Sequence, residues 1–111
     1  MLAKKYRITP SFVFKKTLEK GKRRENQYFK IFFCKNNMDI SRFAVIISSK
    51  IWKSAVKRNL IKRRIKHIFR ELILFLPSGF DILLFVKKDC LDMPFQTLEN
   101  QLKEFLMANI K

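Results

Sequence analysis

The sequence predicts an α/β fold of the α+β two-layer sandwich type, formed as a single domain over residues 1–111. Three observations predict it. A chain of 111 residues suits one domain with its own core. At 48% hydrophobic residues, the chain is too apolar for a disordered polycation. Helical and strand-like periodicities alternate along it in the order α-β-β-α-β-α, which is typical of helices packed on a central sheet.

The first half of the chain predicts one helix and two strands. Thr9-Pro10-Ser11 supplies a helix start, and Gly21 ends that helix at about residue 20. Residues 27–35 are aromatic and β-branched, as strands are, and the Asn36-Asn37 pair after them predicts a turn. A second strand is expected over residues 43–48, which form a nearly continuous apolar run.

The second half begins with the longest helical pattern, from Ser54 to about Phe75, which ends before the breakers Pro77-Ser78-Gly79. Residues 80–86 predict a third strand, and a final helix is expected from about Pro94. Apolar residues recur at helical spacing on the predicted inner faces of these two helices: Ile61, Ile65, Ile68 and Leu72 on the first, and Phe95, Leu98, Leu102, Phe105 and Leu106 on the second.

The net charge of +16 is concentrated in two segments. Residues 1–24 carry nine Lys or Arg and one acid, and residues 50–70 carry nine Lys or Arg and no acid. The rest of the chain is nearly neutral, so the charge forms a patch and is not a general solubility bias. Such a patch favours a polyanionic partner, either nucleic acid or an anionic membrane surface.

Several classes of protein are disfavoured by simple counts. Two cysteines without a CxxC pattern predict free thiols in a reducing cytosol, and a chain with neither a long apolar run nor a secretory signal is expected to be cytoplasmic. Two glycines cannot build a glycine-rich phosphate loop. The single histidine, His67, disfavours His-dependent catalysis and zinc hydrolysis, so neither catalytic residues nor metal ligands are predicted. His67 is expected to pack or to contact phosphate.

The helix over residues 54–75 carries the strongest functional signal. At about 100° per residue, its isoleucines share one sector and a contiguous basic arc lies beside them. A solvated face is the alternative, but such faces usually mix charge signs and this arc contains no acid. We therefore predict an RNA-binding surface formed by this helix and the residues before it: Lys50, Lys53, Lys57, Arg58, Asn59, Lys62, Arg63, Lys66 and Arg70.

Aromatic residues predict a second surface, for unpaired bases. If the first strand alternates, Tyr28, Lys30 and Phe32 share one face, and Lys30 makes that face the more solvated one. Phe14 on the first helix is a further candidate for stacking, although for any single phenylalanine a place in the core is the more frequent outcome. Trp52 either stacks on a base or covers the core, and the sequence does not separate these two roles.

Several motifs together resemble the protein subunit of bacterial ribonuclease P, over nearly the whole chain. They are Ser48-Ser49-Lys50-Ile51 before the basic helix, Arg58-Asn59-x-Ile61-Lys62-Arg63 within it, Arg7-Ile8-Thr9 with Phe14 and Gly21 near the start, and Phe-Asp-Ile-Leu-Leu after Gly79. The central helix motif is the specific one. The resemblance also implies a left-handed crossover between the parallel strands, where general chirality rules favour a right-handed one.

The resemblance implies an accessory subunit of an endoribonuclease that removes 5′ leaders from precursor tRNA. Its partners would be ribonuclease P RNA and precursor tRNA, with no membrane partner, and the protein alone is expected to be a monomer. The RNA would perform the hydrolysis with Mg²⁺ that it mainly holds itself, and none would be bound by the protein alone. Carried over by position, Arg58, Asn59, Lys62, Arg63 and Lys66 would face that RNA. A leader-binding cleft would include Phe14, Leu18 and Phe32, and we add Tyr28 and Lys30 to it from their predicted face.

The chain departs from the family pattern at two positions. Leu60 stands where an arginine is usual, and we expect neighbouring Arg64 to compensate. Leu18 stands where the family commonly has a second aromatic, so apolar contact is expected there in place of stacking. Two other readings remain: a ribosomal-type or general nucleic-acid-binding protein, and a peripheral membrane protein with a basic amphipathic helix.

Overall fold

The structure is a computed structural model that describes residues 11–50, 52–90 and 93–110, apart from the side chains of residues 11–14 and 89. The elements follow one another as α1 (Ser11–Lys20), β1 (Lys22–Glu25), β2 (Phe29–Lys35), β3 (Arg42–Ile46), α2 (Ala55–Leu72), β4 (Phe80–Val86), the short 3₁₀ helix η2 (Lys88–Cys90) and α3 (Phe95–Asn109). The predicted α+β fold is confirmed, because three α-helices accompany a mixed sheet.

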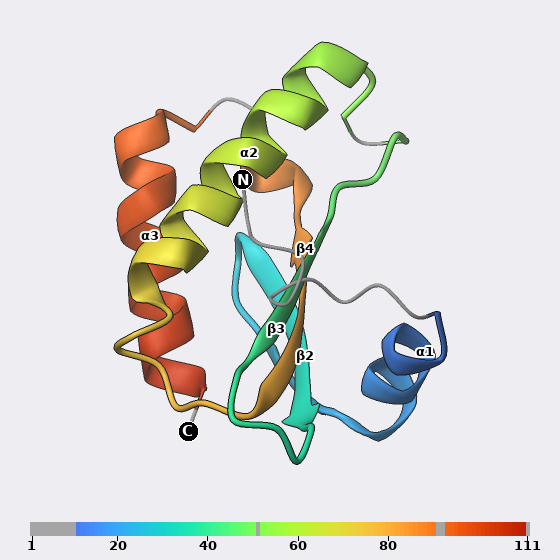
Figure 1. Ribbon diagram of the computed structural model, residues 1–111. Coiled ribbons are helices and arrows are strands. Elements are labelled where there is room, and N and C mark those ends of the chain that lie inside the picture. Colours follow the sequence, from blue (N-terminus) through green and yellow to red (C-terminus); the bar gives the residue numbers. More distant parts are fainter. Residues whose placement is uncertain (1–10, 51, 91–92, 111) are drawn as a thin grey trace.

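The four strands form one sheet in the order β1-β2-β4-β3. β2 is antiparallel to both of its neighbours, whereas β3 and β4 are parallel and are joined through α2. Helices α2 and α3 lie side by side against one face of the sheet, and α1 lies on the other side (Figure 1). On this second face Leu83 is buried, whereas Phe32 and Phe85 are half-exposed, and we call it the open face.

The alternation predicted for the first strand is confirmed within β2. Phe29, Ile31 and Phe33 are buried, whereas Lys30 and Phe32 between them are half-exposed. The buried set faces α2 and α3, as the stacking of Phe29 on Phe105 of α3 shows, with ring centroids 5.9 Å apart. The half-exposed set faces the side of α1. Strand alternation thus separates the core from the open face.

The core between the sheet and the two long helices depends on close aromatic packing. Phe43 of β3 stacks on Phe69 of α2 with 4.0 Å between ring centroids and 10° between ring planes. The stripe predicted on α2 is buried at Ile65, Ile68 and Leu72, and Ile61 packs against the edge of the same core. Burying a side chain of this size stabilises the fold by about 1.5–3 kcal/mol. The apolar stripe therefore determines which flank of α2 remains exposed.

The sequence prediction missed one strand and extended one helix too far. β1 has the sequence Lys-Arg-Arg-Glu and is exposed at all four positions, so it shows no apolar alternation from which a strand could be predicted. Its strand geometry comes from antiparallel pairing with β2. The helix was expected to begin at Ser54, and the structure shows that Ser54 is its N-cap, since its Oγ accepts a hydrogen bond from the Lys57 backbone N–H. α2 ends at Leu72 and not at Phe75, because the backbone tightens into a turn in which the N–H groups of Phe75 and Leu76 both reach the Leu72 carbonyl.

Gly21 brings α1 close to the sheet. A Cβ atom at this position would lie 2.4 Å from the Thr17 carbonyl oxygen and 3.0 Å from that of Phe33. Glycine therefore allows the end of α1 to approach β2, and the Gly21 N–H closes the helix by donating to Thr17. The same approach buries the Thr17 side chain, whose Oγ1 lies 3.7 Å from the Cys34 Sγ.

Candidate nucleic-acid interface

The segment before α2 is held by the first turns of the helix. The Arg58 Nη1 donates to the carbonyl oxygens of Trp52 and Lys53 at 2.5 and 3.2 Å. Trp52 is 1% exposed, which answers the question that the sequence left open: the indole covers the core. The Lys57 Nζ lies over this ring at 5.4 Å from its centre. Arg58 is thus partly committed to the loop, so the more exposed cations beyond it are better placed for a partner.

A basic hollow on the flank of α2 is the first part of the site. It has a volume of about 280 Å³ and is lined by Asn59, Lys62, Arg63 and Lys66. These four residues lie within the arc predicted from the sequence, and no carboxylate is among the residues that line the hollow. Lys50 and Lys53 are exposed in the loop that leads to the helix. Their positive charge adds to the field at this end of α2, where the helix N-terminus also favours anions.

The residues around the missing family arginine lie beside this hollow. Leu60 is 38% exposed, and Val56 one turn before it is 80% exposed. Arg64, expected to compensate for Leu60, instead stacks its guanidinium on Phe95, the first residue of α3, 4.3 Å from the ring centre. Arg64 thus turns toward α3 and contributes packing between the helices, and an apolar strip stands where the family arginine would project.

The C-terminal third of α2 is less basic, because acidic partners lie close to it. The His67 Nε2 lies 2.8 Å from the Glu71 carboxylate, and Lys103 of α3 lies 3.5 Å from the same group. Arg70 is exposed and its Nη2 is 3.5 Å from the His67 Nδ1. The predicted position of Arg70 at the end of the arc therefore adjoins a charge-paired cluster, and the acid-free surface lies over the first two thirds of the helix.

The open face of the sheet forms the second part of the site. Phe32 of β2 and Phe85 of β4 meet edge to face at 5.7 Å between centroids. The Lys30 Nζ lies 5.8 Å from the centre of the Phe32 ring and 5.1 Å from that of Phe85. Two partly exposed rings beneath one ammonium group form a surface on which an unpaired base can stack while its phosphate meets the lysine.

A cleft of about 400 Å³ continues from this aromatic pair to the end of β3. Two lysines of the cleft, Lys87 and Lys88, follow the end of β4. Lys87 contacts the Glu25 carboxylate and donates to the Asn26 carbonyl oxygen, whereas Lys88 is exposed. Sequence reasoning missed the residues from β3 and β4, because the strand register that pairs Phe85 with Lys30 is set by the fold. The lining residues are Lys30, Ile46, Ser48, Phe85, Val86, Lys87 and Lys88.

The other residues predicted for the leader-binding cleft are less closely grouped. Leu18 is half-buried on α1, next to Thr17, which faces Cys34 of the open face. Tyr28 precedes β2 and packs partly buried against the core, edge to face with Phe29, so it does not share the face of Lys30 as the alternation predicted. The reason is that the strand begins at Phe29. The backbone of Phe14 lies in α1, and its side chain is outside the described part of the structure.

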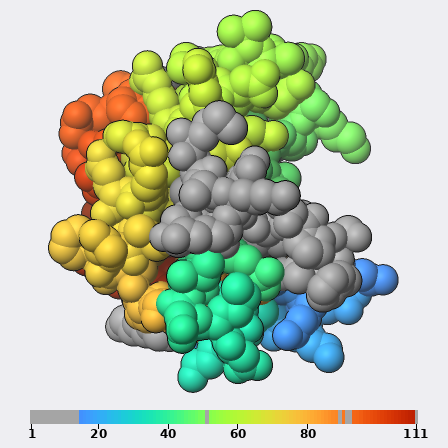
Figure 2. All heavy atoms as spheres, viewed as in Figure 1, coloured from blue at the N-terminus to red at the C-terminus, as the bar shows by residue number. Residues whose placement is uncertain are grey.

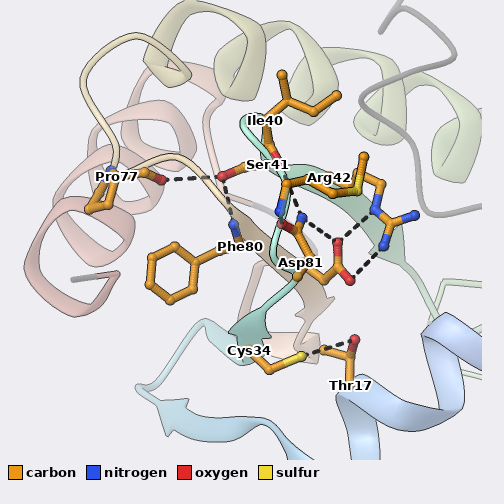
Figure 3. A network of polar contacts seen from close by, with 10 residues as sticks. Thr17, Cys34, Ile40, Ser41, Arg42, Pro77, Phe80 and Asp81 are labelled. Atoms are coloured by element: carbon orange, nitrogen blue, oxygen red, sulfur yellow. Dashed lines mark hydrogen bonds and ion pairs between the residues drawn. The ribbon is translucent and has the colours of Figure 1, made fainter.

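An ion pair at the opposite end of the open face holds β2, β3 and β4 in register (Figure 3). Asp81 is 3% exposed and accepts from the Arg42 guanidinium at 2.8 and 2.9 Å, and from the Asn36 Nδ2 at 3.0 Å. Ser41 accepts from the Phe80 N–H and donates to the Pro77 carbonyl oxygen. Every oxygen of the Asp81 carboxylate is thereby occupied, so this carboxylate is structural.

The hollow on α2 and the cleft lie at the same end of the molecule. Register places Lys30, Phe85 and Ile46 side by side, and Ile46 is the last residue of β3, from which the chain leads to the N-terminus of α2. The cleft thus lies near the carboxyl ends of the parallel strands, where open α/β sheets commonly bind ligands, and the chain leads from there to the helix that carries the hollow. Figure 2, in the same view as Figure 1, shows the side chains of α2 over the upper part of the molecule.

Comparison with known proteins identifies the family. The sequence model of the family Ribonuclease P matches residues 2–109. The chain belongs to the ribonuclease P protein family. It is 33% identical over 107 residues to the ribonuclease P protein component of Thermoanaerobacter sp. strain X514, covering 96% of this chain and 91% of that protein.

Solved structures of the ribonuclease P protein family share the fold. The RNase P protein from Thermotoga maritima aligns with a TM-score of 0.83 and 31% identity, covering 92% of this chain and 96% of that one. The Staphylococcus aureus RNase P protein aligns with a TM-score of 0.85 and 28% identity, covering 95% and 96%. Within the residues described here, no helix is long and apolar enough to cross a membrane, and no three His, Cys, Asp or Glu side chains are grouped so as to hold a metal ion.

Proposed function

We propose that this chain is the RNA-binding subunit of ribonuclease P, that it binds the catalytic RNA and the 5′ leader of precursor tRNA, and that it promotes removal of the leader. The observation that carries the proposal is the pairing, at one end of the molecule, of an acid-free basic hollow with an aromatic cleft. Membership of the family supports the ribonuclease P assignment.

The hollow on α2 is suited to the phosphodiester backbone of a folded RNA. Arg63 can bind phosphate oxygens in a bidentate manner, whereas Lys62 and Lys66 add mobile point charges. The apolar stripe fixes the rotation of α2 against the sheet, so these cations are presented without ordering a flexible segment. Pre-organisation of this kind lowers the entropic cost of binding.

The cleft on the open face is suited to a single strand. Phe32 and Phe85 provide stacking surfaces, and Lys30 and Lys88 lie close enough to neutralise the backbone of the same strand. A 5′ leader is such a strand, whereas mature tRNA lacks it. The cleft would therefore give preference for the precursor over the product.

In this proposal hydrolysis belongs to the RNA partner, which would hold Mg²⁺ and supply the activated water. The protein would contribute positive charge and positioning: its cations reduce phosphate repulsion and fix the leader relative to the catalytic RNA. The contact of the single histidine is consistent with hydrolysis by the RNA, because the His67 Nε2 pairs with the Glu71 carboxylate.

The test is leader release from labelled precursor tRNA at low Mg²⁺, using a bacterial ribonuclease P RNA with and without the chain. Stimulated cleavage at the mature 5′ end is expected. The Lys62→Gln/Arg63→Gln variant should lose most of the stimulation, whereas Lys103→Gln on α3 should retain it, because Lys103 faces Glu71 and Glu99. Stimulation that is absent with the cognate RNA, or RNA affinity that is the same with and without a leader, would favour a general nucleic-acid-binding protein.

Phe14 is tested separately, because the family resemblance places it in the leader-binding cleft. Phe14→Ala should lower the ratio of affinities for precursor and mature tRNA by roughly 5- to 150-fold, the value of one stacked base at about 1–3 kcal/mol. Phe12→Ala on the same helix serves as the neighbouring control. An unchanged ratio in the Phe14 variant would remove this residue from the leader site.

A further inference from the structure

A second basic hollow lies at the other end of the sheet, where α1 meets β1. It has a volume of about 210 Å³ and is lined by Lys20 at the end of α1, Lys22 at the start of β1, Lys35 at the end of β2, and by Phe33, Cys34 and Phe80. We call it the α1–β1 hollow. All three lysines are exposed, and none of them makes an ion pair with a residue that the structure describes.

The α1–β1 hollow is separate from the site proposed above. Register pairs Lys30 with Phe85 at one end of β2 and Lys35 with Phe80 at the other. Five residues of extended strand span about 17 Å, so the α1–β1 hollow and the cleft beside Lys30 lie well apart on the sheet. In Figure 1, α1 lies toward the lower part of the molecule and the N-terminal half of α2 lies at the top. A ligand of one or two nucleotides in one hollow would not reach the other.

The backbone holds two of the lysines at the rim. Gly21 separates Lys20 from Lys22, and its close approach to the Thr17 and Phe33 carbonyl oxygens fixes the turn between them. Lys35 adjoins this turn because Lys22 pairs with Phe33 in the neighbouring strand. Helix α1 and the two strands thus place three ammonium groups around one concavity by main-chain geometry.

Ordinary structural roles can explain why a lysine stands at each of these positions taken one at a time. Lys20 suits the negative end of the helix dipole, and Lys22 on an edge strand discourages pairing with another chain. Neither role requires the three cations to surround one hollow without a carboxylate, where they repel one another. The mixed lining, with cations at the rim and the apolar Phe33 and Phe80 beneath, matches a nucleotide, whose phosphate is anionic and whose ribose and base are largely apolar on their faces.

We propose that the α1–β1 hollow binds a phosphodiester group of RNA, as a second RNA contact independent of α2. This inference rests on the proposed function, since it assumes the same RNA partners. The group could come from ribonuclease P RNA or from the 5′ leader, and the two sources share this chemistry. With RNA held at both ends of the sheet, the domain would bridge two RNA segments.

The experiment measures the affinity of the full chain for RNA as a function of KCl concentration. The wild type is compared with Lys20→Gln/Lys22→Gln/Lys35→Gln, with the corresponding triple change to Arg, and with Lys103→Gln. Each lost phosphate contact lowers the slope of log affinity against log salt by about 0.7–0.9, so the Gln triple should lower it by about two. The Arg triple should keep the wild-type slope, because it keeps the charge, and Lys103→Gln should change it little.

Separate arms identify the source of the phosphate and separate this inference from the proposed function. Loss of slope with ribonuclease P RNA alone assigns the hollow to that RNA, and loss only with leader-bearing precursor tRNA assigns it to the leader. If the wild type binds RNA and the Gln triple keeps the same slope, the inference that the α1–β1 hollow binds RNA is overturned, while the proposed function stands. Absence of wild-type binding to either RNA overturns both. Competition by polyglutamate that depends on the three lysines, with RNA slopes unchanged, would assign the hollow to an acidic peptide and overturn the inference.

Discussion

Replacing Asp81 by Asn should destabilise the fold substantially while keeping the shape of the side chain. The Asp81 side chain is 5% exposed and that of Arg42 18% exposed, so the pair lies largely away from solvent. Breaking one side of a buried ion pair costs about 3–5 kcal/mol. Because Asn keeps one carbonyl acceptor and Arg42 retains some solvent, about 2–3 kcal/mol is expected. For a domain of about 100 residues this corresponds to a fall in Tm of about 10 °C.

The assay is thermal unfolding followed by circular dichroism at pH 7, with Glu25→Gln as the matched control. Glu25 pairs with Arg23 at 2.5 Å, and the two side chains are 36% and 58% exposed. Exposed pairs contribute little to stability, so the control should melt within a few degrees of the wild type. The double variant Arg42→Met/Asp81→Leu should recover part of the loss, since it leaves no unpaired charge. Equal Tm values for Asp81→Asn and Glu25→Gln would refute the reasoning that burial gives this pair its importance.

Two further predictions concern acid stability and RNA affinity. Lys87 and then Arg23 hold the pKa of Glu25 below its ordinary value of 4.5, so the contribution of Glu25 to stability is present above pH 4.5 and is lost as the pH falls through the lowered pKa. Glu25→Gln should therefore flatten the profile of unfolding free energy against pH below about pH 5, as measured by urea titrations from pH 6 to 3. An unchanged profile would rule out the ion pairs of Glu25 as a source of acid sensitivity. Leu60→Arg should steepen the salt dependence of affinity for ribonuclease P RNA by about 0.7–0.9 in slope, because it adds one cation beside the hollow on α2. Leu60→Gln is the uncharged control, and the same slope in both variants would mean that position 60 does not face RNA.

Local signals in the sequence predicted most of the fold. The helical spacing of Ile61, Ile65 and Ile68 and the alternation in β2 each come from interactions within a few residues, which a linear pattern records. β1 was missed because its exposed residues carry no burial pattern and its strand geometry depends on pairing with β2. The position of Arg64 against Phe95 was missed because a contact between two helices leaves no trace in the spacing of either one.

The sequence by itself determined that this chain is a basic, folded domain with one acid-free helix flank, because charge count and helical periodicity are properties of the linear order of residues. It also carries the motifs by which the family was recognised. Tertiary structure alone decided which cations share a hollow, that Trp52 belongs to the core, that Phe85 lies beside Lys30, and that Lys20, Lys22 and Lys35 surround one concavity. The physical reason is that strand register and helix docking bring together residues that lie far apart in the chain, and a site is defined by that proximity.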